Sequence, residues 1–226
     1  MSNAIFVTAT DTDAGKTLVS RAILELAKEH GLSTLGYKPV SAGCELTPEG
    51  LRNEDALFLR QASTIDCPYE KVNPIAYADP VAPHLAAARV NQVITVEQLS
   101  SGMFDLQQYR PDLLLVEGAG GWRLPLGKGS FLSDFVIQHK MPVIFVIGLK
   151  LGCLNHALLT YEALKSDGIN VVGWVANLVD PEMRYLEQNI TSLKDMIDAP
   201  CIGVIPFLDN TEDAKQFLHI DLLLNS

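Results

Sequence analysis

The sequence predicts a single α/β domain built on a doubly wound, mostly parallel sheet with helices on both faces. Short apolar runs of strand length alternate along the chain with amphipathic segments of helical spacing, and five or six such units follow one another. The length of 226 residues suits one large α/β domain. No linker, low-complexity segment or fixed-period repeat divides the sequence. We therefore expect residues 1–226 to form one domain.

The first half of the chain supplies strands and helices in alternation. We predict a strand at 4–9, a helix at 18–31 that ends in glycine, a strand at 34–40, and helices at 53–63 and 94–109. Prolines punctuate the stretch from 64 to 93, which we expect to be an excursion near the edge of the sheet.

The second half continues the same alternation. A strand within 111–121 runs into a glycine turn, followed by a helix at 131–139, a strand at 142–148 and a helix at 155–168. The segments 170–177, 181–197 and 200–207 complete the pattern.

Composition and charge exclude several classes of partner. The net charge is −10 and no basic run exceeds two residues, so nucleic acid is not expected as a main partner. No apolar window approaches the length of a membrane span, and the N-terminus lacks the features of a signal peptide, so we expect a cytoplasmic protein without membrane contact. The four cysteines are scattered, which predicts reduced thiols rather than a zinc site.

Polar or glycine-rich residues follow each apolar run. In doubly wound sheets, ligands bind beyond the carboxyl ends of the strands, so these residues should converge on one face. The segments are 11–17, 38–41, 117–121 and 151–155, with Asn177 and the segment 206–208.

The segment VTATDTDAGKT, residues 7–17, is typical of a phosphate-binding loop. It lies between a predicted strand and a predicted helix and ends in Gly15-Lys16-Thr17, although Thr10 stands where the usual loop has its first glycine. Backbone N–H groups around Gly15 would hold phosphate oxygens, Lys16 would reach the β- and γ-phosphates, and the Thr17 hydroxyl would bind Mg²⁺. The pattern indicates a variant loop for a magnesium–nucleotide complex.

Two further strand ends carry charges suited to phosphoryl transfer. The apolar strand LLLVE delivers Glu117, and a carboxylate in that position can hold Mg²⁺. Lys38 follows the second predicted strand, where it could neutralise an anionic group or be a solvated loop residue. Glu54 and Asp55 open a helix, which the helix dipole alone would explain, and the sequence does not choose between them as metal ligands.

Two other segments could contact ligands. The free N–H groups of Gly152, Cys153, Leu154 and Asn155 at a predicted helix start would suit a carboxylate. Asn177 ends a strand, where its amide could either bind the edge of a nucleobase or cap a turn.

Taken together, TDTDAGKT, GYKPV, EGLRNEDA, VEGAGGW, KLGCLNHALLT and GWVAN resemble the ATP-dependent dethiobiotin synthetases nearly from end to end. The resemblance implies a homodimeric fold like that of the P-loop NTPases. It also implies formation of the ureido ring of dethiobiotin from 7,8-diaminononanoate, CO₂ and Mg-ATP, through a carbamate and a carbamic–phosphoric anhydride, with ADP and phosphate as products.

The resemblance also implies roles for individual residues. Nucleotide contacts fall on Thr12, Asp13, Ala14, Gly15, Lys16, Thr17, Glu117, Gly118, Asn177, Pro206, Phe207 and Leu208. Mg²⁺ falls on Thr17, Asp55 and Glu117, and the two catalytic lysines are Lys16 and Lys38. Substrate contacts fall on Thr12, Lys38, Ser41 and, across the dimer interface, Gly152, Cys153, Leu154 and Asn155.

The chain departs from the family pattern at Ala42, where many relatives carry a hydroxyl residue. Either Ser41 replaces that hydroxyl through a shifted loop, or the substrate hydrogen bond is absent. We also expect at least one of Asp11 and Asp13 to face the cationic amines of the diamine.

Two alternatives remain at this stage. One is an ATPase switch of related fold that positions partner proteins or DNA, against which Asp11 and the lack of a basic patch argue. The other is a different amide-forming ligase on the same fold.

Overall fold

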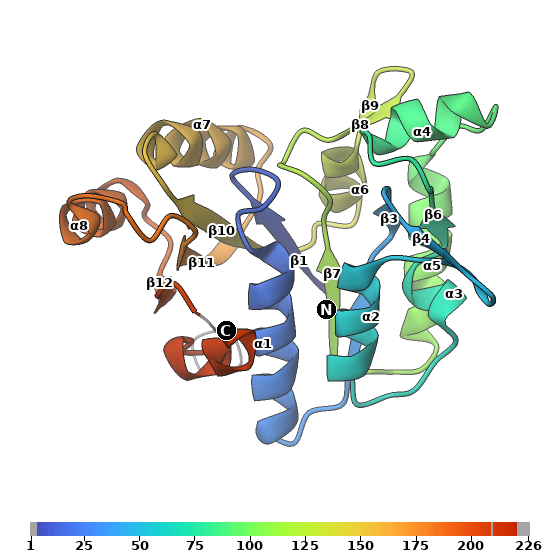
Figure 1. The fold of residues 1–226 in the computed structure, drawn as a ribbon, viewed down its shortest axis with the longest axis horizontal. Coiled ribbons are helices and arrows are strands. Elements are labelled where there is room, and N and C mark those ends of the chain that lie inside the picture. Colours follow the sequence, from blue (N-terminus) through green and yellow to red (C-terminus); the bar gives the residue numbers. More distant parts are fainter. Residues whose placement is uncertain (1–3, 209, 221–226) are drawn as a thin grey trace.

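The computed structural model describes residues 4–208 and 210–220, and its centre is a six-stranded parallel sheet (Figure 1). The strand order is β12-β11-β10-β1-β7-β2, with every neighbouring pair parallel. The strands are β1 (Ala4–Ala9), β2 (Thr34–Tyr37), β7 (Leu113–Glu117), β10 (Val143–Leu149), β11 (Val171–Leu178) and β12 (Cys201–Ile205). The predicted doubly wound parallel sheet is confirmed.

Helices cover both faces of this sheet, as predicted. One face packs against α1 (Lys16–Glu29), α2 (Glu54–Ala62) and the 3₁₀ helix η1 (Thr211–Phe217). The other packs against α5 (Val96–Gln107), α6 (Leu132–Gln138), α7 (Cys153–Ser166) and α8 (Leu186–Met196). Of the helices that the structure describes, none is long and apolar enough to cross a membrane.

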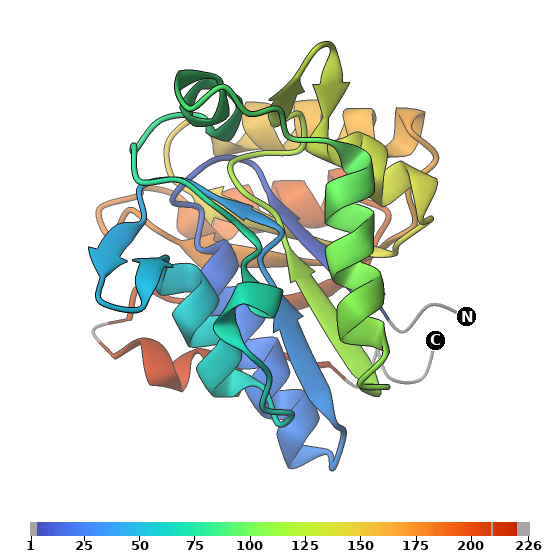
Figure 2. The ribbon, with the colours of Figure 1, turned by 90° about the vertical axis from the view of Figure 1, so that its right-hand side faces the viewer.

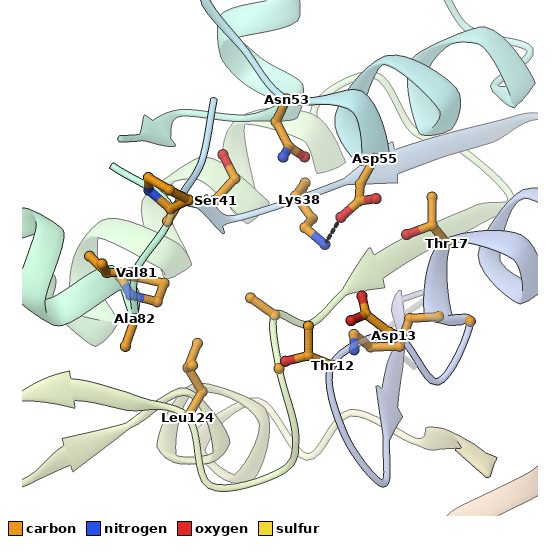
Figure 3. A pocket seen from close by; sticks show the side chains of 17 residues that line it. Thr12, Asp13, Thr17, Lys38, Ser41, Asn53, Asp55, Val81, Ala82 and Leu124 are labelled. Carbon is orange, nitrogen blue, oxygen red and sulfur yellow. Dashed lines mark hydrogen bonds and ion pairs between the residues drawn. The ribbon is translucent and has the colours of Figure 1, made fainter. Parts of the chain in front are cut away.

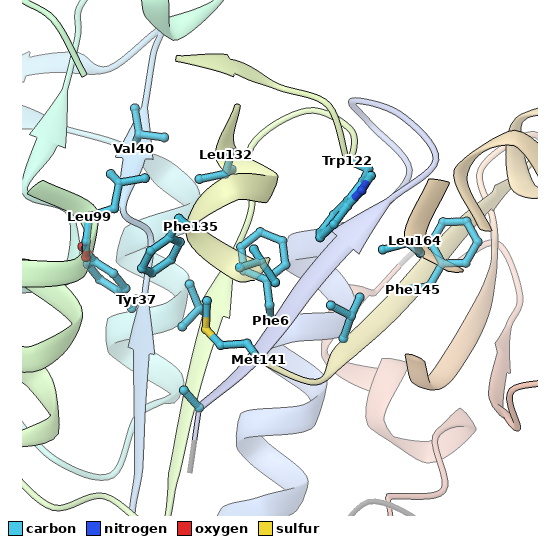
Figure 4. Close-up of a cluster of buried hydrophobic side chains, with 14 of the residues drawn as sticks. Phe6, Tyr37, Val40, Leu99, Trp122, Leu132, Phe135, Met141, Phe145 and Leu164 are labelled. Atoms are coloured by element: carbon cyan, nitrogen blue, oxygen red, sulfur yellow. The ribbon is translucent and has the colours of Figure 1, made fainter. Parts of the chain in front are cut away.

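Alternation along each strand explains the two cores. In β1, Phe6 belongs to the core under α5–α8, whereas Val7 belongs to the core under α1 and α2. Because both faces are covered, successive residues of a strand are all apolar, and this produces the continuous runs in the sequence. Figure 4 shows Phe6, Phe135 and Trp122 meeting in the first of these cores, and the rings of Phe6 and Trp122 contact each other edge to face.

The proline-punctuated stretch lies beside β2, the edge strand of the sheet, as expected. It contains α3 (Tyr69–Val72), β6 (Ile75–Ala76) and α4 (Pro83–Arg89). The strand predicted at 34–40 is broken: after β2 the chain leaves the main sheet at Lys38 and pairs again as β3 (Val40–Ser41) with β6. Figure 2 shows this part of the chain to one side of the sheet.

The sequence did not predict two small hairpins, β4–β5 (Glu45–Thr47 with Gly50–Arg52) and β8–β9 (Pro125–Gly127 with Ser130–Phe131). Both have strands of two or three residues, too short for an apolar alternation to mark them. The four cysteines are free thiols, as predicted, and three of them are buried.

Close packing brings α2 onto β2. A methyl group at Gly36 of β2 would lie 2.7 Å from the Leu59 Cβ of α2. The absence of a side chain at Gly36 therefore lets the helix lie directly against the strand. This contact matters for function because α2 begins at the site described next.

Candidate functional site

A cleft of about 790 Å³ opens at the carboxyl ends of β1, β2 and β7 (Figure 3). Its charged side is formed by the loop after β1, by Lys38 after β2 and by Asp55 at the start of α2. Its other side is mostly apolar and includes Val81, Ala82 and Leu124. The rule that ligands bind beyond the carboxyl ends of parallel strands therefore locates the cleft correctly.

The loop between β1 and α1 has the geometry of an anion site. Gly15 precedes α1 with φ 91° and contributes no side chain that could cap the helix. The N–H groups of the first turn of α1 therefore point out of the helix end, and the helix dipole adds positive potential there. Lys16 is buried and donates from Nζ to the Asp11 carbonyl oxygen at 3.1 Å, so its ammonium lies over the loop.

A second feature of the loop is its contact with β11. Asn177 donates from Nδ2 to the Ala14 carbonyl oxygen at 3.0 Å. A Cβ on Gly15 would collide with the same amide group. Asn177 therefore supports the loop from beneath, and its Oδ1 atom is the part left to accept a hydrogen bond from a ligand.

The Lys38 ammonium lies between two carboxylates at the base of the cleft. It donates to Glu117 Oε1 at 2.6 Å, to Asp55 Oδ2 at 2.8 Å and to the Gly118 carbonyl oxygen at 3.2 Å. Thr17 donates from Oγ1 to the same Glu117 oxygen at 2.9 Å. Residues from four separate elements thus meet within one hydrogen-bonded cluster.

Burial and charge act on this cluster in opposite directions. Burial alone would lower the pKa of Lys38, but Glu117 and Asp55 outweigh it and raise that pKa. Burial would raise the pKa of Asp55, but Lys38 outweighs it and lowers that pKa. The Lys38–Asp55 pair is therefore charged near neutral pH.

Among the residues that the structure describes, none forms an ion pair with Lys16, although the charges of Glu117, Asp55 and Asp13 act to raise its pKa. Burial, with the nearby Lys38 charge, lowers the pKa of Lys16 to about 8. An anion placed against this lysine would restore the missing counter-charge. In the free protein, Lys16 is therefore a buried cation beside the phosphate-binding loop, and a bound anion would stabilise its charge.

Within the described part of the chain, Glu117 Oε2 is buried and has no hydrogen-bond partner. A buried carboxylate oxygen without a partner is costly, and a cation would satisfy it. The Thr17 hydroxyl and the two carboxylates offer only oxygen atoms, which suit a hard divalent cation such as Mg²⁺. The oxygen donors of Thr17, Asp55 and Glu117, which the family resemblance implied for Mg²⁺, therefore lie close together, and their chemistry fits that ion.

Several of the predicted site residues line the cleft together: Thr12, Asp13, Gly15, Lys16, Thr17, Lys38, Ser41 and Asp55. Glu117 lies just beneath them, fully buried. Ala14, Gly118, Asn177, Pro206, Phe207, Leu208, Gly152, Cys153, Leu154 and Asn155 are not part of its lining. Of these, Gly118 accepts from Lys38, and Asn177 donates to Ala14, which directly precedes Gly15 in the phosphate-binding loop.

The two aspartates of the loop lie differently, and the expectation that at least one of them faces the substrate amines stays a prediction. The carboxylate of Asp11 accepts from the Thr12 N–H at 2.8 Å through Oδ1 and lies 3.4 Å from Lys150 Nζ through Oδ2. It is therefore turned away from the cleft, whereas Asp13, with φ 56°, lines it. Of the two aspartates, Asp13 is the one placed to meet a cationic substrate.

The Ser41 hydroxyl is less available than the sequence suggested. It is buried and donates to Asn73 Oδ1 at 2.7 Å. Cys44 Sγ lies 3.1 Å from the same oxygen and must be the donor there, because the hydroxyl proton is already used. A substrate could only donate to Ser41, not accept from it.

Sequence reasoning missed Asn53 and the apolar wall of the cleft. That wall is formed by Ala42, Pro80, Val81, Ala82, Pro83 and Leu124, with Ala119 and Gly120 nearby. The only sequence signal was the DPVAP segment inside the excursion, which its position beside the β2 edge brings to the cleft.

The family profile and the curated relatives described here each match nearly the whole chain. The protein-family profile described as an AAA domain matches residues 3–215. The ATP-dependent dethiobiotin synthetase BioD of Aeromonas hydrophila is 49% identical over 222 residues, covering 98% of both chains. The protein of the same name from Vibrio campbellii is 46% identical and covers 100% of both chains.

Solved structures with a similar fold are more distant in sequence. The cell division protein MinD of Aquifex aeolicus superposes with a TM-score of 0.56 at 16% identity, covering 95% of this chain and 86% of that one. The cell division protein FtsY of Thermotoga maritima gives a TM-score of 0.52 at 16% identity, covering 99% of this chain and 68% of that one. These likenesses concern the fold alone, a parallel sheet with helices on both faces.

The lowered pKa of Lys16 predicts proton uptake when ADP binds in the absence of divalent metal. At pH 8 the free lysine, with its pKa of about 8, is half protonated. The diphosphate raises this pKa again, so the complex should take up about half a proton. The contribution of Lys16 to this proton uptake should disappear near pH 6.5, because the lysine is already protonated there before ADP binds. Calorimetric titrations in two buffers of different ionisation enthalpy measure the uptake.

The matched control is Lys16→Arg, whose guanidinium stays charged throughout this pH range and should take up no proton at pH 8. Equal binding heats for the wild-type protein in both buffers at pH 8 would contradict the prediction.

Proposed function

The chain belongs to the family of ATP-dependent dethiobiotin synthetases, and we propose that it converts 7,8-diaminononanoate, CO₂ and ATP into dethiobiotin, ADP and phosphate. The observation that carries this proposal is the cluster of Lys16, Thr17, Lys38, Asp55 and Glu117 at one end of a cleft whose other end is apolar. The charged end suits a nucleotide triphosphate and the apolar end suits an alkyl chain.

The nucleotide phosphates would lie on the N–H groups between Thr12 and Thr17, with Lys16 bridging the terminal phosphates. Asn177 would accept from the amino group of adenine through Oδ1, since its Nδ2 atom already donates to Ala14. The segment 206–208, which follows β12 and in which Pro206 and Phe207 are exposed, would cover the base. Thr17, Asp55 and Glu117 would hold Mg²⁺, which supplies positive charge against the phosphate oxygens.

The substrate's alkyl chain would lie against Val81, Ala82 and Leu124, removing apolar surface from water. Its amines would face the charged end, where Asp13 offers a carboxylate and Ser41 a lone pair. Lys38 lies at the boundary between the two halves of the cleft (Figure 3). This is where a carbamate on the substrate would approach a nucleotide held by the loop.

The chemistry then follows from the charges. One amine adds to CO₂ and loses a proton, which gives a carbamate anion. In the free protein the three N–H groups of Lys38 Nζ donate to Glu117, Asp55 and the Gly118 carbonyl oxygen, so Lys38 would exchange one of these acceptors for the carbamate. A carbamate oxygen attacks the γ-phosphorus as the bond to ADP breaks, while Lys16 and Lys38 stabilise the charge on the transferring phosphoryl group. The second amine attacks the carbonyl carbon of the anhydride, the ring closes, and phosphate leaves. The lysines act by position and charge, so no covalent enzyme intermediate is required.

We further propose that Gly152, Cys153, Leu154 and Asn155 serve the site of a second copy of the chain. They lie at the start of α7 and outside the cleft of their own chain. Leu151 beside them is 94% exposed, which is unusual for a leucine and suits an interface.

Of the alternatives, a switch ATPase is supported only by the fold shared with MinD and FtsY, and a likeness at 16% identity concerns fold rather than activity. A different amide-forming ligase on the same fold is opposed by the near full-length identity of 46–49% to dethiobiotin synthetases.

The reaction predicts that ADP release depends on both small substrates. With Mg-ATP alone, release should be slow, and it should rise at least tenfold on adding 7,8-diaminononanoate and bicarbonate together. A coupled assay for ADP with each substrate omitted in turn measures this dependence. Strong hydrolysis without either substrate, or stimulation only by protein or DNA, would rule out the proposed reaction.

Replacing Glu117 by glutamine should weaken the divalent metal site while keeping the shape of the side chain. At Mg²⁺ concentrations on the order of 1 mM, we expect the turnover rate to fall by about 10²-fold or more, because the site loses one charged ligand. The measurements are a Mg²⁺ titration of activity and Mn²⁺ binding followed by electron paramagnetic resonance. Near-normal activity across the whole titration would remove Glu117 from the metal ligands.

The shared site predicts that the active form is a dimer. Light scattering at the concentrations used for the assay gives the mass, and Leu151→Asp should shift it towards the monomer and lower activity together. A monomer with full activity would contradict the proposed arrangement.

A further inference from the structure

Asn73 directly follows α3, and its buried side-chain amide is hydrogen-bonded on both sides. Its Nδ2 atom donates to the Lys38 carbonyl oxygen at 2.7 Å. Its Oδ1 atom accepts from Ser41 Oγ at 2.7 Å and from the Tyr69 hydroxyl at 3.1 Å. Asn73 does not line the cleft. Two of its partners, Lys38 and Ser41, do line it, and the third, Tyr69, is hydrogen-bonded to Asn53, which also lines it.

The first of these bonds fixes the backbone of Lys38. This residue lies just beyond the end of β2 and before β3, so the ladder of the main sheet does not hold it. Its N–H donates to the Val72 carbonyl oxygen at 2.8 Å, and its own carbonyl oxygen accepts from Asn73. Both main-chain bonds of Lys38 therefore come from α3 and the residue after it. The position from which the ammonium reaches Asp55 and Glu117 depends on them.

The hydrogen bond from Tyr69 connects Asn73 to the start of α2. The Tyr69 hydroxyl donates to Asn73 and accepts from the Asn53 N–H at 2.8 Å. Asn53 is the N-cap of α2, and its Oδ1 accepts from the Ala56 N–H at 3.2 Å. Asp55 lies in the first turn of that helix, so the position of its carboxylate depends on how this helix end is held.

The tyrosine is itself held in place. The Arg52 guanidinium lies over its ring, 4.2 Å from the centroid, and burial raises the pKa of Tyr69. The phenol therefore keeps its proton and remains a donor to Asn73 throughout the neutral pH range.

We propose that Asn73 is a positioning residue for the reaction: its one amide fixes Lys38 through one bond and the Asp55 end of α2 through another, and so sets how the lysine and the carboxylate face each other. The inference rests on the proposed function, because it assigns a catalytic purpose to the Lys38–Asp55 pair. A displacement of about 1 Å at such a pair can cost 10²-fold in rate. Groups that orient metal ligands typically contribute 10–100-fold to metal affinity.

Two variants separate the two bonds. Asn73→Leu keeps the number and branching of the side-chain heavy atoms and removes all three hydrogen bonds of the amide, to Lys38, Ser41 and Tyr69. Tyr69→Phe removes one oxygen and its two hydrogen bonds, which join Asn73 to the Asn53 N–H, and leaves the bond to Lys38 in place. The matched control is Ser100→Ala. It deletes another buried hydroxyl, one whose bonds go to the Val96 carbonyl oxygen and His139 Nε2, away from the cleft. Thermal unfolding of all three variants measures the loss of stability that comes from removing a buried polar group.

For Asn73→Leu we expect kcat to fall by about 10²-fold with saturating Mg-ATP and diamine, while the KM for ATP stays within threefold, because the phosphate loop is untouched. For Tyr69→Phe we expect about a tenfold loss of Mn²⁺ affinity in the presence of ADP, measured by electron paramagnetic resonance without turnover. Ser100→Ala should change neither quantity, whatever its effect on unfolding.

The proposal is overturned if folded Asn73→Leu keeps kcat within threefold of wild type, or if Tyr69→Phe binds Mn²⁺ as tightly as wild type. It is also overturned if Ser100→Ala loses activity to the same extent. Should Asn73→Leu fail to fold, the Mn²⁺ measurement on Tyr69→Phe still decides the case. Because that measurement uses only Mn²⁺ and ADP, it remains valid even if the diamine proves not to be the substrate.

Discussion

The site depends on one buried lysine that holds two carboxylates. β7 is covered on both faces and ends in Glu117, whose exposure is 0%, so the sheet delivers a negative charge into the interior. A buried carboxylate is tolerated only beside a positive charge, and Lys38 at the end of β2 provides it. The same ammonium also pairs with Asp55 at 2.8 Å, in the first turn of α2. The parallel pairing of β2 with β7 brings the ends of both strands together, where Lys38 and Glu117 meet. The close packing at Gly36 holds α2 against β2 and so keeps Asp55 near the same lysine.

Much of the fold could be predicted from the sequence because each core element leaves a periodic signal. Strands buried on both faces read as continuous apolar runs, and the amphipathic helices between them gave the order and the two-sided covering. Charged residues such as Glu117 and Lys38 stood out because they end those runs. The choice between Glu54 and Asp55 came from the family resemblance, and the structure places Asp55, rather than Glu54, in the lining of the cleft.

The remaining features rest on contacts between distant parts of the chain, which leave no local pattern. Nothing around Asn73 in the sequence indicates that its amide bonds to the Lys38 carbonyl oxygen, 35 residues away. The Ser41 hydroxyl looked available because its burial depends on β3 pairing with β6, a two-residue ladder. The sequence could not separate Asp11 from Asp13 because the partner of Asp11, Lys150, is 139 residues further along the chain. The apolar wall at Val81 and Ala82 is brought to the cleft by a segment without clear periodicity.

The contact between the phosphate loop and β11 also restricts how this protein can change over generations. The space above Gly15 is filled by the Asn177 amide, so any side chain at position 15 meets an occupied volume. A shorter residue at 177 would empty that volume but would leave position 15 at φ 91°, which side chains rarely adopt. A substitution at position 177 would therefore not open position 15 to a side chain. An evolutionary path away from glycine here is closed in either order.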